Sequence, residues 1–111
     1  MILCGQKVII GHVGDSRVYR FRDDGLRQLT SDHSLVAAMR AAGISNVIIS
    51  AKFGHVITRA IGVSEATDPD IISEKVEPGD KFLLCTDGLT DVVDDETIAR
   101  FLERLPSSEA C

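Results

Sequence analysis

The chain has 111 residues, of which 44% are hydrophobic and 26% charged, and its net charge at pH 7 is −5. That length suits one domain, and the composition is that of a globular rather than a disordered protein. The acidic balance excludes the basic surface with which proteins usually bind nucleic acid. We expect no membrane span and no signal peptide, because apolar runs are far shorter than ~18 residues and no basic stretch precedes one.

The first third of the chain predicts three strands that form an antiparallel meander. A β-branched run at 8–13 lies between Gly5 and Gly14, and the run at 17–22 alternates arginines with large apolar residues. The Asp23-Asp24-Gly25 segment is typical of a tight hairpin turn. Residues 26–29 are therefore expected to return as the partner strand.

A helix is predicted over residues 34–42, with Ser31 or Asp32 as its N-cap and Gly43 at its C-terminal stop. Apolar residues recur on one face of this segment. Residues 47–49 are typical of a strand, whereas residues 50–54 show no clear period. The middle of the chain is thus the least readable part.

The last third predicts two strands and a final helix. Residues 71–76 are typical of a strand, the Glu77-Pro78-Gly79-Asp80 segment fits a type II turn, and residues 82–86 predict a buried central strand. Asp94 or Asp95 would cap the final helix, whose apolar face would hold Ile98, Phe101, Leu102 and Leu105. The fold class expected from this order of elements is α+β.

Cysteine and histidine spacing argues against a zinc site or a disulfide framework. The three cysteines are odd in number and far apart, without any C-x-x-C pair. This pattern is typical of reduced thiols and predicts a cytoplasmic protein. The three histidines are equally scattered, and we expect them in turns or on the surface: His12, His33 and His55.

Aspartates at strand ends are the candidates for chemistry. Asp15 follows the strand at 8–13, and Asp87 follows the strand at 82–86, with Asp91 four residues further on. Carboxylates held at strand ends suit Mg²⁺ or Mn²⁺, which prefer oxygen ligands. An aspartate beside a glycine is equally a common turn former, so the pattern alone leaves both interpretations open.

Other charged groups have a structural interpretation. Asp94, Asp95 and Glu96 would complement the dipole of the final helix. Arg17, Arg20 and Arg22 are interpreted as surface charges of a strand rather than as a phosphate clamp.

Four segments along the chain carry short, recognisable motifs in a fixed order. Residues 11–17 read G-H-V-G-D-S-R, residues 29–34 read L-T-S-D-H-S, and residues 57–62 read I-T-R-A-I-G. The last segment, residues 78–91, contains P-G-D and T-D-G-L-T-D. Together the four segments cover most of residues 8–100, and they resemble motifs of the metal-dependent serine/threonine protein phosphatases (PPM, type 2C family), the bacterial members most closely.

The resemblance implies a fold of two antiparallel β-sheets packed face to face and flanked by helices. It implies hydrolysis of phosphoserine and phosphothreonine in proteins, among them the substrates of a cognate protein kinase, by water activated on two Mn²⁺ or Mg²⁺ ions. Asp87 matches the carboxylate of the catalytic metal pair, and Asp15, Asp87 and Asp91 match the residues that hold a third, weaker ion. The segment at 44–56 corresponds to a flap that meets substrate.

Two metal motifs of that family have no counterpart in these 111 residues, namely an early D-G-x-G-G and a late G-x-D-N. We therefore expect an incomplete PPM-type domain over residues 1–111 that is inactive alone and exposes sheet edges through which copies self-associate. The alternatives are a non-catalytic phosphatase-like binding module and a different Mg²⁺-dependent phosphoesterase.

Overall fold

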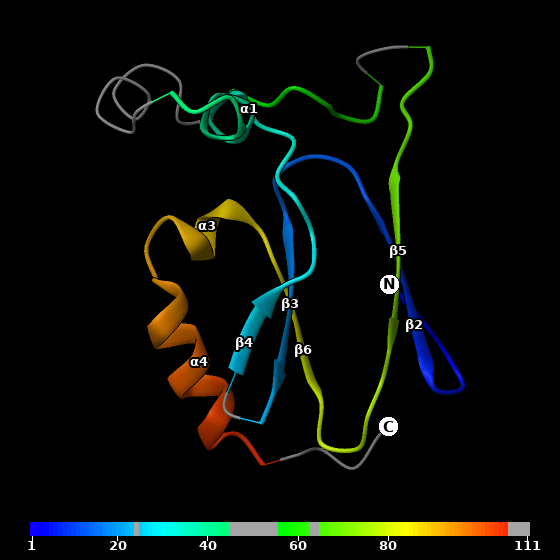
Figure 1. Cartoon of the computed structure of the whole chain (residues 1–111), viewed down its shortest axis with the longest axis vertical. Helices are drawn as coiled ribbons and strands as arrows, with labels where there is room; N and C mark the ends of the chain where they lie inside the picture. The colour runs from blue at the N-terminus through cyan, green and yellow to red at the C-terminus, as the bar shows by residue number, and fades with distance from the viewer. Residues whose placement is uncertain (24, 45–55, 63–64, 107–111) are drawn as a thin grey trace.

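The computed structural model describes residues 1–23, 25–44, 56–62 and 65–106, and these form two three-stranded antiparallel sheets with helices. Figure 1 shows the sheets side by side, with α3 and α4 on the outer side of one of them. The first sheet has the order β1 (Ile2–Cys4), β2 (Lys7–His12) and β5 (Asp70–Lys75). The second has the order β4 (Gly25–Gln28), β3 (Arg17–Arg22) and β6 (Lys81–Cys85). The predicted α+β class is confirmed.

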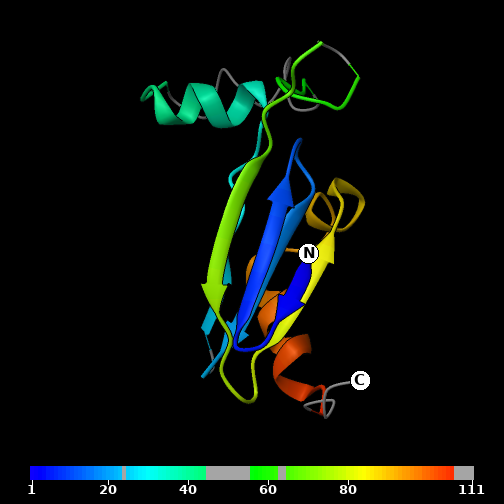
Figure 2. The ribbon, with the colours of Figure 1, turned by 90° about the vertical axis from the view of Figure 1, so that its right-hand side faces the viewer.

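A first hydrophobic core lies between the two sheets. Buried side chains alternate along β2, as expected for a strand with one face against a core. Val8 and Ile10 from β2 pack with Val18 from β3, and four partly buried residues complete the cluster: Leu29, Ile72, Val76 and Phe82. Figure 2 shows the first sheet from its outer side.

A second core lies between β3 and the helix α4 (Asp95–Arg104). Phe21 of β3 packs against Ile98 and Leu102, which recur at the four-residue spacing of one helix face. Asp94 is the N-cap, since its side chain accepts a hydrogen bond from the Thr97 amide at 2.8 Å. The predicted apolar face included Phe101, but the structure leaves this residue 64% exposed, so the buried face of the helix is narrower than predicted. Leu105, which follows the helix, is likewise exposed.

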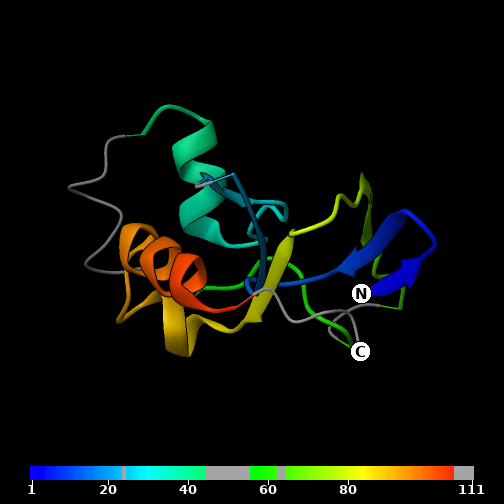
Figure 3. The same ribbon diagram turned by 90° about the horizontal axis from the view of Figure 1, so that it is seen from below.

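The predicted three-stranded meander is wrong, because β2 and β3 belong to different sheets. β3 buries both of its faces: Val18 points into the core between the sheets, whereas Phe21 points toward α4. The segment between β2 and β3 takes the chain from one sheet to the other (Figure 3), and it contains Gly14 at φ +106°. The ion pair between Arg20 of β3 and Glu74 of β5, at 3.0 Å, joins the two layers.

The strand β6 lies at an edge of its sheet, which corrects the expectation of a buried central strand. Its Leu84 side chain is 53% exposed, and its hydrogen-bonded neighbour is β3. The type II turn before β6 is confirmed: Gly79 has φ +90°, and the Asp80 amide donates to the Glu77 carbonyl at 3.1 Å. This turn carries the chain from the first sheet back to the second.

Two short helices border the end of the second sheet. Helix α1 (Leu35–Ala41) begins one residue later than predicted and is capped by Ser34, whose Oγ accepts from the Ala37 amide, rather than by Ser31 or Asp32. Gly43 ends it in the left-handed region, as predicted. Helix α3 (Asp87–Thr90) and strand β1 were not predicted. The predicted strand at 47–49, most of the flap-like segment at 44–56 and His55 lie outside the described residues. Among the described residues, no helix is long and apolar enough to span a membrane.

Candidate metal centre

Asp15, Asp87 and Asp91, the three aspartates selected from the sequence, line one cavity of about 200 Å³. Asp15 comes from the turn between β2 and β3, whereas the other two come from the segment that follows β6. The two segments meet because β6 pairs with β3, with Cys85 opposite Arg17. Strand pairing therefore closes a gap of more than seventy residues in the chain.

Asp87 and Asp91 lie one helical turn apart at the two ends of α3. The Asp91 amide donates to the Asp87 carbonyl at 2.8 Å, which places both side chains on the same side of the turn. Both residues are exposed, whereas Asp15 is half-buried. Three carboxylates therefore line one cavity, and carboxylate oxygens are the ligands that hard divalent cations prefer.

An arginine and a further aspartate belong to the same cavity. Arg17 Nε lies 2.9 Å from Asp32 Oδ1, and Arg17 Nη2 lies 2.6 Å from Asp32 Oδ2. The hydrogen bond to Asp32 raises the pKa of Arg17, so its charge is permanent. The expectation that Arg17 is only a surface charge is therefore wrong, because it lines the cavity. Its position two residues after Asp15 is the sequence feature that could have indicated this role.

Tyr19 binds the third nitrogen of the Arg17 guanidinium, the one that makes no hydrogen bond to Asp32. Its side chain is fully buried, its hydroxyl accepts from Arg17 Nη1 at 3.1 Å, and it donates to Asp95 Oδ1 at 3.0 Å. Burial raises the pKa of the Tyr19 phenol. The series of side-chain hydrogen bonds Asp32–Arg17–Tyr19–Asp95 thus connects the cavity wall to the first turn of α4.

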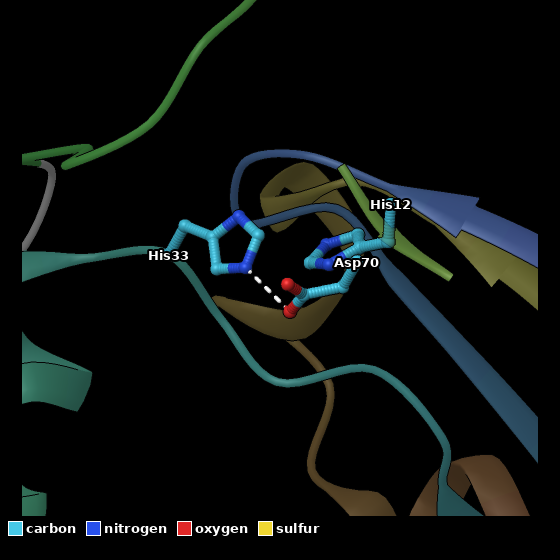
Figure 4. Close-up of side chains that lie close together, drawn as sticks. All are labelled: His12, His33 and Asp70. Carbon is cyan, nitrogen blue, oxygen red and sulfur yellow. Dashed lines mark hydrogen bonds and ion pairs between the residues drawn. The ribbon is translucent and has the colours of Figure 1, made fainter. Parts of the chain in front are cut away.

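A second group of titratable residues lies beside the Asp15 turn. His12, His33 and Asp70 bring one potential ligand atom each to within 4.8 Å of one another (Figure 4). Both histidines are buried, at 6% and 8% exposure, which corrects the expectation of turn or surface residues. Neither histidine was predicted from the sequence to be a metal ligand, although both lie inside the segments that carry the family resemblance.

The cysteines that the structure describes are free thiols: Cys4 is exposed and Cys85 half-buried. Burial raises the pKa of Cys85, which keeps its thiol protonated near neutral pH.

Comparison with known proteins identifies the family. The profile described as Protein phosphatase 2C matches residues 1–109. The serine/threonine phosphatase stp of Listeria innocua is 36% identical over 104 residues, which are 92% of this chain and 41% of that protein. The structure of the S. agalactiae serine/threonine phosphatase superposes with a TM-score of 0.86 at 34% identity, covering 94% of this chain and 44% of the other.

A third similar structure contains metal. The catalytic domain of the serine threonine protein phosphatase PstP, in complex with 2 manganese ions, has a TM-score of 0.81 and 34% identity over 96% of this chain and 44% of its own. The chain thus spans less than half the length of these relatives. The profile match over nearly all residues and the shared two-sheet architecture place the chain in the protein phosphatase 2C family.

Proposed function

We propose that the chain forms part of the catalytic centre of a metal-dependent protein serine/threonine phosphatase. The observation that carries the proposal is the convergence of Asp15, Asp87 and Asp91 on one cavity. The substrates would be proteins phosphorylated on serine or threonine, including those of a cognate protein kinase. Family membership supports this substrate class, since the similar proteins bear serine/threonine phosphatase names.

The proposed cofactor is Mn²⁺ or Mg²⁺, two ions in the complete site and a third, weaker one beside Asp15. The residues present fit these ions, because Asp87, Asp15 and Asp91 offer carboxylate oxygens and hard divalent cations take oxygen ligands. When bound, such ions act as Lewis acids that lower the pKa of a water and offset charge developing on the phosphoryl group. The manganese ions of the PstP structure support the same choice of metal.

We propose that residues 1–111 contribute an incomplete PPM-type domain and that further metal ligands lie outside them. The chain spans 41% and 44% of two similar phosphatases, which supports this division. Affinity for a divalent ion grows with the number and charge of its ligands. The three aspartates should therefore bind Mn²⁺ weakly and turn over little phosphopeptide on their own.

The experiment that tests the proposal is an Mn²⁺ titration of the 111-residue chain. Electron paramagnetic resonance monitors binding, because the signal of the free ion decreases as Mn²⁺ binds. Asp87→Asn should weaken binding, because it replaces a charged ligand by a neutral one in the same shape. Asp68→Asn is the matched control, since Asp68 is exposed and outside the cavity. Equal Mn²⁺ affinity of all three proteins would overturn the metal assignment.

A phosphothreonine peptide separates the catalytic interpretation from a non-catalytic binding module. Turnover with Mn²⁺ that Asp87→Asn abolishes would support catalysis by these residues. Specific peptide binding without turnover, unchanged by Asp87→Asn, would favour the binding module instead.

We also propose that isolated copies self-associate through exposed sheet edges. β1 is an edge strand, and its Ile2 and Leu3 side chains are 63% and 60% exposed. Exposed apolar edges are templates for pairing with another chain. Sedimentation should show concentration-dependent association that Leu3→Lys reduces, whereas a monomer at all concentrations would contradict the proposal.

A cytoplasmic location is the remaining part of the proposal. The free thiols of Cys4 and Cys85 support it, because such compartments keep thiols reduced. Cell fractionation with thiol labelling tests this location.

A further inference from the structure

His33 holds the Gly14 turn by two hydrogen bonds to the same residue. Its backbone amide donates to the Gly14 carbonyl at 2.8 Å, and its ring Nδ1 accepts from the Gly14 amide at 3.1 Å. Its own carbonyl accepts from the Thr58 amide at 2.8 Å. Gly14 has φ +106°, and the next residue is Asp15, which lines the cavity. The position of this ring therefore bears directly on where the Asp15 carboxylate lies.

These contacts assign the tautomer of His33. Because Nδ1 accepts a hydrogen bond from a backbone amide, the ring proton resides on Nε2. That proton points at Asp70, whose Oδ2 lies 2.8 Å from Nε2 (Figure 4). Asp70 also accepts from Arg59 Nη1 at 3.3 Å. The hydrogen bond from His33 lowers the pKa of Asp70, so the carboxylate stays ionised near neutral pH and favours this tautomer.

We propose that Asp70 and His33 are positioning residues for Asp15, an inference that rests on the proposed role of Asp15 in cation binding. Asp70 holds the proton on His33 Nε2, which leaves Nδ1 free to fix the Gly14 amide, and the fixed turn aims the adjacent carboxylate into the cavity. Groups that hold the ligands of a metal site in position commonly change its metal affinity when they are removed.

The same chemistry argues against a cation held by the cluster itself. A metal on His33 Nε2 would force the ring proton to Nδ1, where it would face the Gly14 amide hydrogen. His12 is better suited to a metal, because its Nε2 donates to the Ser16 carbonyl at 2.7 Å and its Nδ1 has no hydrogen-bond partner among the described residues. One free nitrogen and one carboxylate are too few ligands for a specific site.

Two substitutions at His33 separate its two contacts. His33→Asn puts an amide oxygen near the position of Nδ1 and so keeps an acceptor for Gly14. The longer side chain in His33→Gln instead puts its amide near the position of Nε2, beside Asp70. It leaves the Gly14 amide without a side-chain acceptor. The readouts are the hydrogen exchange rate of the Gly14 amide, measured by NMR, and the Mn²⁺ affinity of the same chain.

We expect His33→Gln to speed Gly14 exchange by about three- to tenfold, as for the loss of one hydrogen bond, and to weaken Mn²⁺ binding by about tenfold. His33→Asn should retain both properties near wild type. Unchanged Gly14 exchange and Mn²⁺ affinity in His33→Gln would overturn the proposal.

Asp70→Ala tests the carboxylate by a signature that loss of stability alone would not produce. Long-range ¹H–¹⁵N spectra of His33 should show the proton on Nε2 in the wild type and a mixture of tautomers in Asp70→Ala. Asp70→Asn, which keeps an acceptor, should restore the single tautomer, and Asp68→Ala should leave it unchanged. A single Nε2–H tautomer in Asp70→Ala would overturn the role of Asp70.

Two further outcomes separate this inference from the proposed function. If the wild type binds no Mn²⁺, the proposed function fails, whereas the Gly14 exchange rates and the tautomer still decide whether Asp70 and His33 fix the turn. If equimolar Zn²⁺ removes the His33 Nε2 proton, the cluster is a cation site and the positioning role is overturned.

Discussion

Arg17 and Asp32 form a bidentate ion pair in the wall of the cavity, with N–O distances of 2.9 Å from Nε to Oδ1 and 2.6 Å from Nη2 to Oδ2. Asp32 Oδ1 also accepts from the side-chain Nε2 of Gln28 at 3.1 Å. The side chains are only 25% and 16% exposed, so water screens the pair incompletely. This contact ties β3 to the segment that precedes α1.

Asp32→Asn should destabilise the fold by about 1–3 kcal/mol, because it leaves the half-buried Arg17 without its charged partner. Chemical denaturation followed by circular dichroism measures the effect. Glu96→Gln is the matched control, since Glu96 pairs with Arg100 on the exposed surface of α4 and such pairs contribute little. Equal losses in the two variants would contradict the importance of the cavity wall.

Tyr19 is the single tyrosine of a chain that has no tryptophan, so near-ultraviolet absorbance reports its ionisation alone. Burial holds the pKa of this phenol above its ordinary value of ~10. The neutral form is favoured by folding, so this stabilisation is complete below pH ~10 and is lost as the pH rises from there through the folded pKa. Titration in urea should return to the ordinary value, and a native titration at that same value would contradict a buried phenol.

Asp80 should account for part of the decrease in the free energy of unfolding at acidic pH. The hydrogen bonds from Arg22, at 2.7 Å each, lower the pKa of Asp80 below that of an unfolded aspartate. Its stabilisation is therefore present above pH ~3.9 and is lost as the pH falls through the lower, folded pKa. Asp80→Asn should flatten the decline of unfolding free energy with acid, measured as denaturation midpoints across pH. Glu65→Gln, at an exposed position, should follow the wild-type curve.

The face of α4 is tested by two large-to-small substitutions. Leu102→Ala should cost about 2–5 kcal/mol, because Leu102 is buried in the core against Phe21 and its removal leaves a cavity. Phe101→Ala removes a larger side chain that is 64% exposed and should change the free energy of unfolding little. A greater loss from Phe101→Ala in thermal or urea unfolding would restore the wider apolar face that the helical spacing predicts.

Local elements of this chain are readable from its residues because their causes are local. The strand at 17–22, the Pro78-Gly79 turn and the Asp94 cap each depend on neighbours within a few residues, and the structure has all three. The family motifs also single out Asp15, Asp87 and Asp91, which share a cavity in the structure.

Pairing and burial depend on contacts that local patterns do not encode. Alternation along β2 and β3 is the same whether they pair or lie in different sheets, so only the tertiary structure separates them. It likewise puts β6 at an edge and buries His12 and His33, since those outcomes depend on which distant segment packs against each residue. Residue chemistry thus selected the candidate ligands, whereas long-range strand pairing brought them together and added the Asp70–His33–Gly14 contacts behind Asp15.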